Sequence, residues 1–118
     1  MLGMAIFAGC CIGLDVITGL VKAFYLGTVN STLLRKGLYH KLAEIICIIF
    51  VYGIQYGIPL LGVNINIPLM APVCVYICLM EIISILENLG DTNPDLGKIL
   101  KPYLEKMKGE KQDGTNGN

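Results

Sequence analysis

The chain has 118 residues, of which 54% are hydrophobic and 15% are charged, and its formal net charge is zero. A soluble globular domain averages about 25% charged residues, so this composition favours a small integral membrane protein. The basic residues are clustered outside a region from Leu42 to Gly97 that contains no Lys or Arg. Clustering of this kind is typical of membrane topology and gives little support to nucleic-acid binding.

The first apolar segment, residues 2–26, is long enough to span a bilayer. Asp15 and Lys22 interrupt it seven residues apart, so they lie on nearly the same face of a helix. Small and polar side chains recur along that face at helical spacing: Ala8, Cys11, Asp15, Thr18, Gly19 and Lys22. Lys22 also has a simpler interpretation, in which its side chain extends to the lipid headgroups.

Residues 27–41 are polar and basic. Asn30 and Ser31 are suitable N-caps for a short helix within this stretch. Basic side chains interleaved with leucines favour a segment at the membrane surface, and an ordinary loop held on one side by its charge explains the pattern equally well. The residues expected to set topology or lie at the membrane surface are Arg35, Lys36, Lys41 and Glu44.

A second span is predicted over residues 42–61 and a third over residues 67–88, joined by an uncharged turn. Pro68 and Pro72 fall in the first turns of the third span, where neighbouring structure tolerates a missing N–H donor. Glycines in the first two spans allow close approach of helices, and helix packing is expected at Gly9, Gly13, Gly19, Gly53 and Gly57.

The third span carries Glu81 inside its apolar body, followed by Ser84 and Asn88 at helical spacing. Counted along the helices, Asp15 and Glu81 lie at a similar depth in the inner half of the bilayer. The two polar stripes either line water in an oligomer or hold the three helices together in one bundle. The residues expected to line a pore or pair between subunits are Asp15, Thr18, Lys22, Glu81, Ser84 and Asn88.

The basic loop and the basic C-terminal region are both expected in the cytoplasm, which places the N-terminus outside and the C-terminus inside. After a transmembrane domain over residues 1–90, an amphipathic cytoplasmic helix is predicted over 91–108, opened by Asn93, Pro94 and Asp95. Residues 109–118 are predicted to be a disordered polar tail. The expected fold class is therefore an all-α integral membrane protein with three spans.

The sequence contains no nucleophile motif, no phosphate-binding loop and no Cys/His spacing of a zinc site. We therefore expect no enzymatic activity, no cofactor and no metal.

Three blocks follow one another along the chain: LDVITGLVKA from Leu14 to Ala23, the basic segment from Ser31 to Lys41, and EIISILENLG from Glu81 to Gly90. In this order, with a proline-containing stretch and a leucine/lysine helix after the last block, the chain resembles the phage-lysis and toxin-secretion holins of Gram-positive bacteria and their phages. The resemblance covers about residues 13–108. Many members of that family carry more residues before the aspartate-bearing block.

The resemblance implies a multi-pass protein of the bacterial cytoplasmic membrane that forms homo-oligomers. Such a protein opens a lesion through which an endolysin or a toxin leaves, for host cell lysis or secretion. Its partners are the lipid bilayer, further copies of itself and the cargo.

Two other classes stay open on the residues alone. One is a small ion- or proton-conducting membrane protein, or an assembly subunit of a transporter, with Asp15 and Glu81 as proton carriers. The other is a structural membrane anchor whose C-terminal helix binds a partner.

Overall fold

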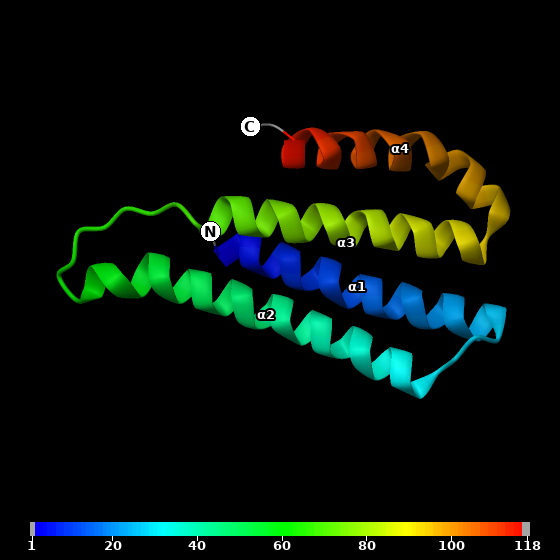
Figure 1. The fold of residues 1–118 in the computed structure, drawn as a ribbon, viewed down its shortest axis with the longest axis horizontal. Helices are drawn as coiled ribbons and strands as arrows, with labels where there is room; N and C mark the ends of the chain where they lie inside the picture. The colour runs from blue at the N-terminus through cyan, green and yellow to red at the C-terminus, as the bar shows by residue number, and fades with distance from the viewer. Residues whose placement is uncertain (1, 117–118) are drawn as a thin grey trace. The chain divides into compact units, whose positions relative to one another are not determined.

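The computed structural model describes the backbone of residues 2–116 and the side chains of residues 2–109. The regular structure in this part of the chain is entirely helical, which confirms the predicted fold class. Three of the helices, α1 to α3, are long and apolar enough to cross a membrane. The helices are α1 (Leu2–Leu26), α2 (Ser31–Leu60), α3 (Met70–Thr92) and α4 (Pro94–Asn116) (Figure 1).

The chain divides into two compact units. Unit 1 contains Met1–Ile12 and Asn30–Cys78, and unit 2 contains Gly13–Val29 and Leu79–Asn118. The helices α1 and α3 therefore contribute residues to both units, while α2 belongs to unit 1 and α4 to unit 2.

Local chemistry explains where the first two helices end and where α2 begins. Gly27 and Gly62 adopt positive φ angles of 66° and 79°, a conformation that glycine reaches without steric cost. Gly27 directly follows α1, and Gly62 follows Leu61, the C-cap of α2. Asn30 is the N-cap of α2, since its side chain accepts hydrogen bonds from the backbone N–H groups of Thr32 and Leu33. The predicted capping role of Asn30 is confirmed.

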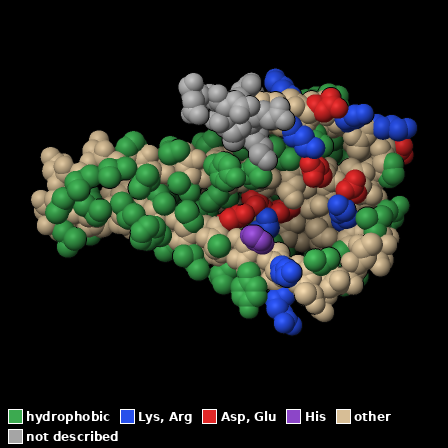
Figure 2. Space-filling view, in the orientation of Figure 1, with side chains coloured by type: hydrophobic (Ala, Val, Ile, Leu, Met, Phe, Trp, Pro, Cys, Tyr) green, Lys and Arg blue, Asp and Glu red, His purple; other side chains and the backbone are tan. Residues whose placement is uncertain are grey.

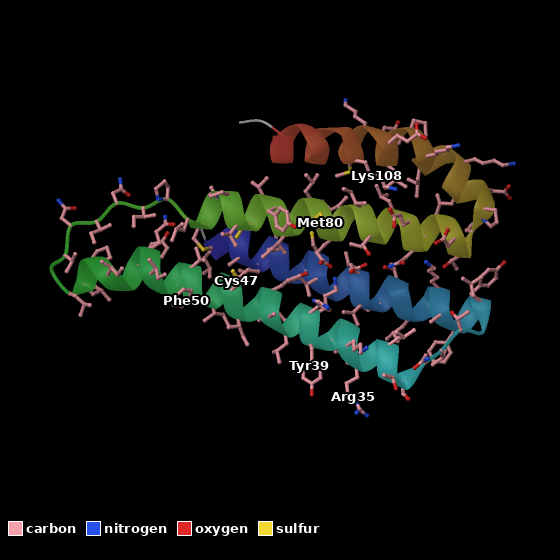
Figure 3. All side chains as sticks on the ribbon, viewed as in Figure 1. Arg35, Tyr39, Cys47, Phe50, Met80 and Lys108 are labelled. Carbon is pink, nitrogen blue, oxygen red and sulfur yellow. The ribbon has the colours of Figure 1, made fainter. Side chains whose placement is uncertain are left out.

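The predicted surface helix and the second span form one continuous helix, α2, of 30 residues. No proline occurs between Ser31 and Ile58, so nothing in this stretch removes a backbone donor or forces a break. At about 1.5 Å per residue α2 is roughly 45 Å long, which exceeds a hydrocarbon core of about 30 Å. The excess length allows the basic first turns of α2 to lie outside the hydrocarbon core. Arg35 and Tyr39 project outward from these turns (Figure 3).

The last two helices begin or end at different residues from those predicted. The helix α3 covers Met70–Thr92 rather than residues 67–88, because Pro68 lies outside it and the next proline that stops a helix is Pro94. Asn93 caps α4, with its Oδ1 accepting from the N–H of Leu96 at 3.3 Å. The helix α4 extends to Asn116 rather than ending near residue 108, where the disordered tail was predicted to begin. Helix propensity does not explain this extension, because two glycines, Gly109 and Gly114, lie within it.

Unit 1 is built around one hydrophobic cluster drawn from three helices. The buried residues of the cluster are Ala8, Ile12, Ile48, Val51, Met70, Cys74 and Ile77. At its edge the backbone N–H of Met70, which has no acceptor within its own helix, donates to Gln55 Oε1 at 3.0 Å. This side-chain bond from α2 ties down the first turn of α3.

Large apolar side chains remain exposed over the three candidate spans. Ile49 and Phe50 of α2, for example, are each 65% exposed. Hydrophobic side chains are spread over much of the surface visible in Figure 2. A soluble protein would rarely leave so much apolar surface in water, whereas lipid tails or further copies of the chain cover such side chains at no cost.

In unit 2 the end of α3 and the start of α4 meet through two glycines. A Cβ atom built on Gly97 would lie 3.0 Å from the carbonyl oxygen of Gly90 and 3.1 Å from its Cα atom. A Cβ on Gly90 would lie 3.2 Å from Gly97 Cα. Backbone atoms cannot move aside as a flexible side chain does, so this contact requires glycine at both positions.

Gly97→Ala is therefore expected to separate α4 from α3, at a cost of about 1–3 kcal/mol for overpacking. Alanine favours the helix itself over glycine, so any loosening comes from the contact and not from α4 unfolding. The measurement is crosslinking of a Glu87→Cys/Lys108→Cys pair by a short bismaleimide reagent, in a chain without its native cysteines, and the yield should fall because the two positions move apart. Gly109→Ala is the control, because a Cβ there meets no atom of the described residues within 4 Å. Equal yields in both variants would contradict the close packing.

Candidate intramembrane polar site

A hydrogen-bonded network joins α1 and α3 in unit 2. The Asp15 carboxyl is buried, with 7% of the residue exposed. The side-chain amide of Asn88 donates to Asp15 Oδ1 at 3.1 Å and to Thr18 Oγ1 at 3.1 Å. Three residues singled out by helical spacing in the sequence are thus brought together, and one amide group bridges the other two.

The geometry of α1 prepares Thr18 for this contact. Its Oγ1 lies 2.8 Å from the carbonyl oxygen of Leu14, to which it donates. The hydrogen bond to the Leu14 carbonyl uses the only hydrogen of the Thr18 hydroxyl group. Its oxygen can therefore only accept a hydrogen bond from Asn88. Gly19 lies next to Thr18 and close to the same amide, since a Cβ built at that position would make an ordinary van der Waals contact with Asn88 Nδ2 at 3.6 Å.

The second buried acid, Glu81, lies two turns before Asn88 on α3 and is 2% exposed. Ser84, half-buried between them in the sequence, completes the same stripe. A carboxyl group is costly to bury in a membrane, so two buried acids in spanning helices indicate a functional or assembly role for unit 2.

Lys22 pairs with Asp91, not with either buried acid. Its Nζ lies 2.8 Å from Asp91 Oδ2, and the two side chains are 34% and 52% exposed. Asp91 was missed because the third span was predicted to end at residue 88. A usable signal was present, since Asp91 continues the spacing of Glu81, Ser84 and Asn88 by another three residues.

A second ion pair connects α3 to α4. Lys108 Nζ lies 2.9 Å from Glu87 Oε1, and both side chains are largely exposed. Exposed pairs of this kind contribute little to stability on their own. Together with the Gly90–Gly97 contact, this pair defines the register of α4 against α3.

The residues predicted to set topology lie on α2. Arg35 and Lys36 are exposed, and Lys41 is half-buried. Glu44 is also half-buried, but its Oε2 atom is buried and has no hydrogen-bond partner among the described residues. Glu44 and His40 line one cavity of about 500 Å³ in unit 1. This oxygen of Glu44 therefore faces protein atoms.

Four of the predicted packing glycines make no close helix contact within the chain. A Cβ built at any of them would meet no described atom within 4 Å: Gly9, Gly13, Gly53 and Gly57. Gly19 differs, because a Cβ built there would reach ordinary van der Waals contact with Asn88. A packing role for the other four stays a prediction for contacts between copies of the chain.

The Lys22–Asp91 pair gives a prediction of small magnitude. Lys22→Met should change the onset of membrane permeabilisation only slightly, since an exposed pair is worth about 0.5 kcal/mol. The charge-swapped Lys22→Asp/Asp91→Lys chain should restore wild-type timing at matched expression. A large change in Lys22→Met that the swap does not reverse would mean that Lys22 acts through another group.

Three apolar helices of spanning length, with a buried polar network between two of them, define a multi-pass helical membrane protein. Residues 2–109 match the Bacteriophage holin family, and the chain belongs to this family. It is a holin-like protein of the bacterial cytoplasmic membrane. No curated protein and no solved structure matches the chain.

Proposed function

We propose that this protein oligomerises in the cytoplasmic membrane and opens a lesion that releases an endolysin or a toxin. Family membership gives the class, and the observation that carries the proposal for this chain is the buried network of Asp15, Thr18 and Asn88. The network joins two spanning helices through groups that water could solvate equally well.

In the proposed mechanism, the folded single chain corresponds to the closed state. Asp15 and Asn88 then satisfy each other inside the protein, away from lipid. When several copies rearrange around a water-filled opening, water replaces Asn88 as the partner of Asp15, and the stripe that continues through Ser84 and Glu81 becomes its lining. Hydration of a buried acid is favourable, so this exchange compensates for the lost contact between helices.

The experiment is induced expression in cells that carry fluorescent cargo of graded size, from a small dye to a folded protein. A holin releases the folded protein once permeabilisation begins. Dissipation of the membrane potential without any loss of dye or protein would overturn the proposal.

A small ion- or proton-conducting protein is the second candidate, and the burial of both Asp15 and Glu81 favours it. The same assay separates the two functions, because a proton pathway passes ions alone. A purely structural anchor would pass neither ions nor cargo.

A further inference from the structure

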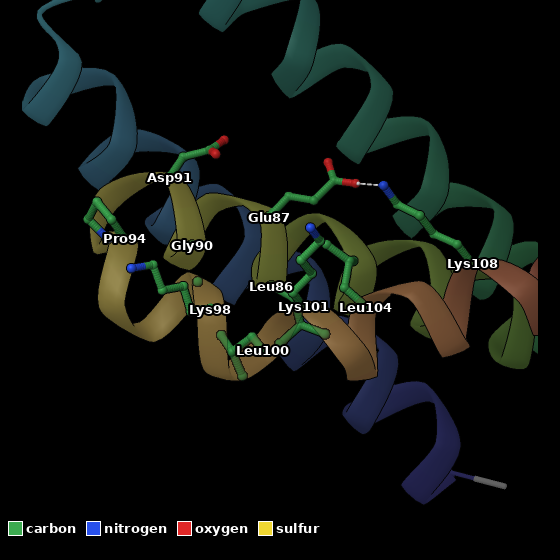
Figure 4. Close-up of a pocket in the computed structure, with 11 residues that line it drawn as sticks. Leu86, Glu87, Gly90, Asp91, Pro94, Lys98, Leu100, Lys101, Leu104 and Lys108 are labelled. Carbon is green, nitrogen blue, oxygen red and sulfur yellow. Dashed lines mark ion pairs between the residues drawn. The ribbon is translucent and has the colours of Figure 1, made fainter.

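An open groove of about 510 Å³ lies between the end of α3 and the first turns of α4, within unit 2 (Figure 4). Leu86 forms part of its wall on the α3 side, and Leu100 and Leu104 form part of it on the α4 side. The polar network of Asp15 does not contribute to this groove, and none of the predicted site residues lines it.

The charges around the groove do not cancel. Glu87 is paired with Lys108 inside the groove, as the dashed line in Figure 4 marks, and Asp91 is paired with Lys22. Both acids are therefore already neutralised. Lys98 and Lys101, one helical turn apart on α4, line the same groove, and neither has an ion-pair partner among the residues that the structure describes.

The groove adjoins the C-terminal end of a helix that is long and apolar enough to span a membrane. The spanning helix α3 ends at Thr92, and α4 starts two residues later at Pro94. The end of a spanning helix lies in the headgroup region, where a basic side chain within reach of the surface attracts anionic lipid. A phosphate beside Lys98 and Lys101 would have leucine side chains next to it for the start of an acyl chain.

We propose that this groove binds an anionic phospholipid, with its phosphate held by Lys98 and Lys101 and its acyl chains against Leu86, Leu100 and Leu104. A phosphate with an attached apolar chain matches both the two unpaired ammonium groups and the apolar wall. A zwitterionic lipid such as phosphatidylcholine also carries a phosphate, but its choline cation offsets the attraction of that phosphate to the two ammonium groups, whereas an anionic lipid carries no such cation. The inference goes beyond the proposed release function and does not depend on it.

The test uses the purified full chain in a neutral detergent, titrated with phosphatidylglycerol, with bound lipid counted by native mass spectrometry. Wild-type protein is expected to bind phosphatidylglycerol in preference to phosphatidylcholine. Lys98→Gln/Lys101→Gln should weaken phosphatidylglycerol binding at least about tenfold, since each lysine near an anionic lipid contributes to attraction. Each single substitution is measured too, and circular dichroism checks that the helices persist.

The matched control is Lys36→Gln/Lys106→Gln, which removes the same charge from lysines outside the groove. Retained phosphatidylglycerol binding in the control supports a specific site at Lys98 and Lys101. Equal weakening in both double variants would overturn the proposal, because it would show that the lipid is attracted by the total positive charge of the chain. Water-soluble glycerol phosphate and inorganic phosphate serve as competitors. If either displaces the lipid at an equal concentration, the groove holds a free anion and the lipid assignment is wrong.

Discussion

Asn88→Ala is expected to bring release forward, with an earlier onset than wild type at the same amount of protein in the membrane. The substitution removes both hydrogen bonds that the Asn88 amide donates, to Asp15 and to Thr18. Interhelical hydrogen bonds in membranes average about 0.6 kcal/mol, so the pair contributes about 1 kcal/mol to the closed state. Its loss shifts the equilibrium between closed and open states about fivefold.

The matched control is Asn64→Ala, which removes the same side chain from the exposed turn between α2 and α3. That variant should lyse at the wild-type time. Asp15→Asn is a second variant for comparison with Asn88→Ala. Its side-chain oxygen can still accept a hydrogen bond from Asn88, so this substitution removes only the acidic group. If Asn88→Ala shows wild-type timing at matched expression, the network does not hold the closed state.

Reversal of the basic charges on α2 should have the second large effect. In Arg35→Glu/Lys36→Glu/Lys41→Glu, three positive charges at the start of a spanning helix become three negative charges. Positive residues next to a span are retained in the cytoplasm, so the variant should lose its uniform orientation and its release activity should fall to background.

Orientation is measured by labelling a thiol near each terminus with a membrane-impermeant reagent, in a chain without its native cysteines. The wild-type chain is expected to label at the N-terminus and not at the C-terminus in intact cells. Arg35→Lys/Lys36→Arg/Lys41→Arg keeps the charges and should behave as wild type. Normal orientation in the glutamate variant would contradict the assignment of these residues to topology.

Periodicity of the apolar and polar residues was sufficient to predict much of the fold. The first span was predicted over the residues that form α1, because the sequence stays predominantly apolar up to Leu26 and turns polar after Gly27. Helical spacing placed Asp15 and Thr18 on one face of the first span and Asn88 on one face of the third. Whether these two faces line water or contact each other stayed open in the sequence, and the structure joins them by hydrogen bonds.

Other features depend on how the helices are rotated and shifted against one another, which the pattern within each segment does not contain. Lys22 lies on nearly the same face of its helix as Asp15, but the structure pairs it with Asp91 of α3. Gly90 and Gly97 carried no helix-packing motif of the GxxxG kind, because they belong to different helices separated by the turn at Asn93.

Composition also did not predict that the basic segment and the second span form one continuous helix. A change of composition near Lys41 suggested a boundary between two helices, but the backbone responds to donors, acceptors and allowed dihedral angles. With no proline or cap in the interval, α2 continues from a charged environment into an apolar one. Composition therefore indicates where the membrane begins and not where the helix begins.

In the proposed mechanism, the polar stripe of Glu81, Ser84 and Asn88 on α3 faces protein before release and water during it. The most direct measurement is the labelling of a Ser84→Cys thiol, in a chain without its native cysteines, by a membrane-impermeant reagent before and after release is triggered. We expect little labelling before the trigger and strong labelling as folded cargo leaves the cell. Labelling that is equally strong before the trigger, or absent while cargo leaves, would contradict the account.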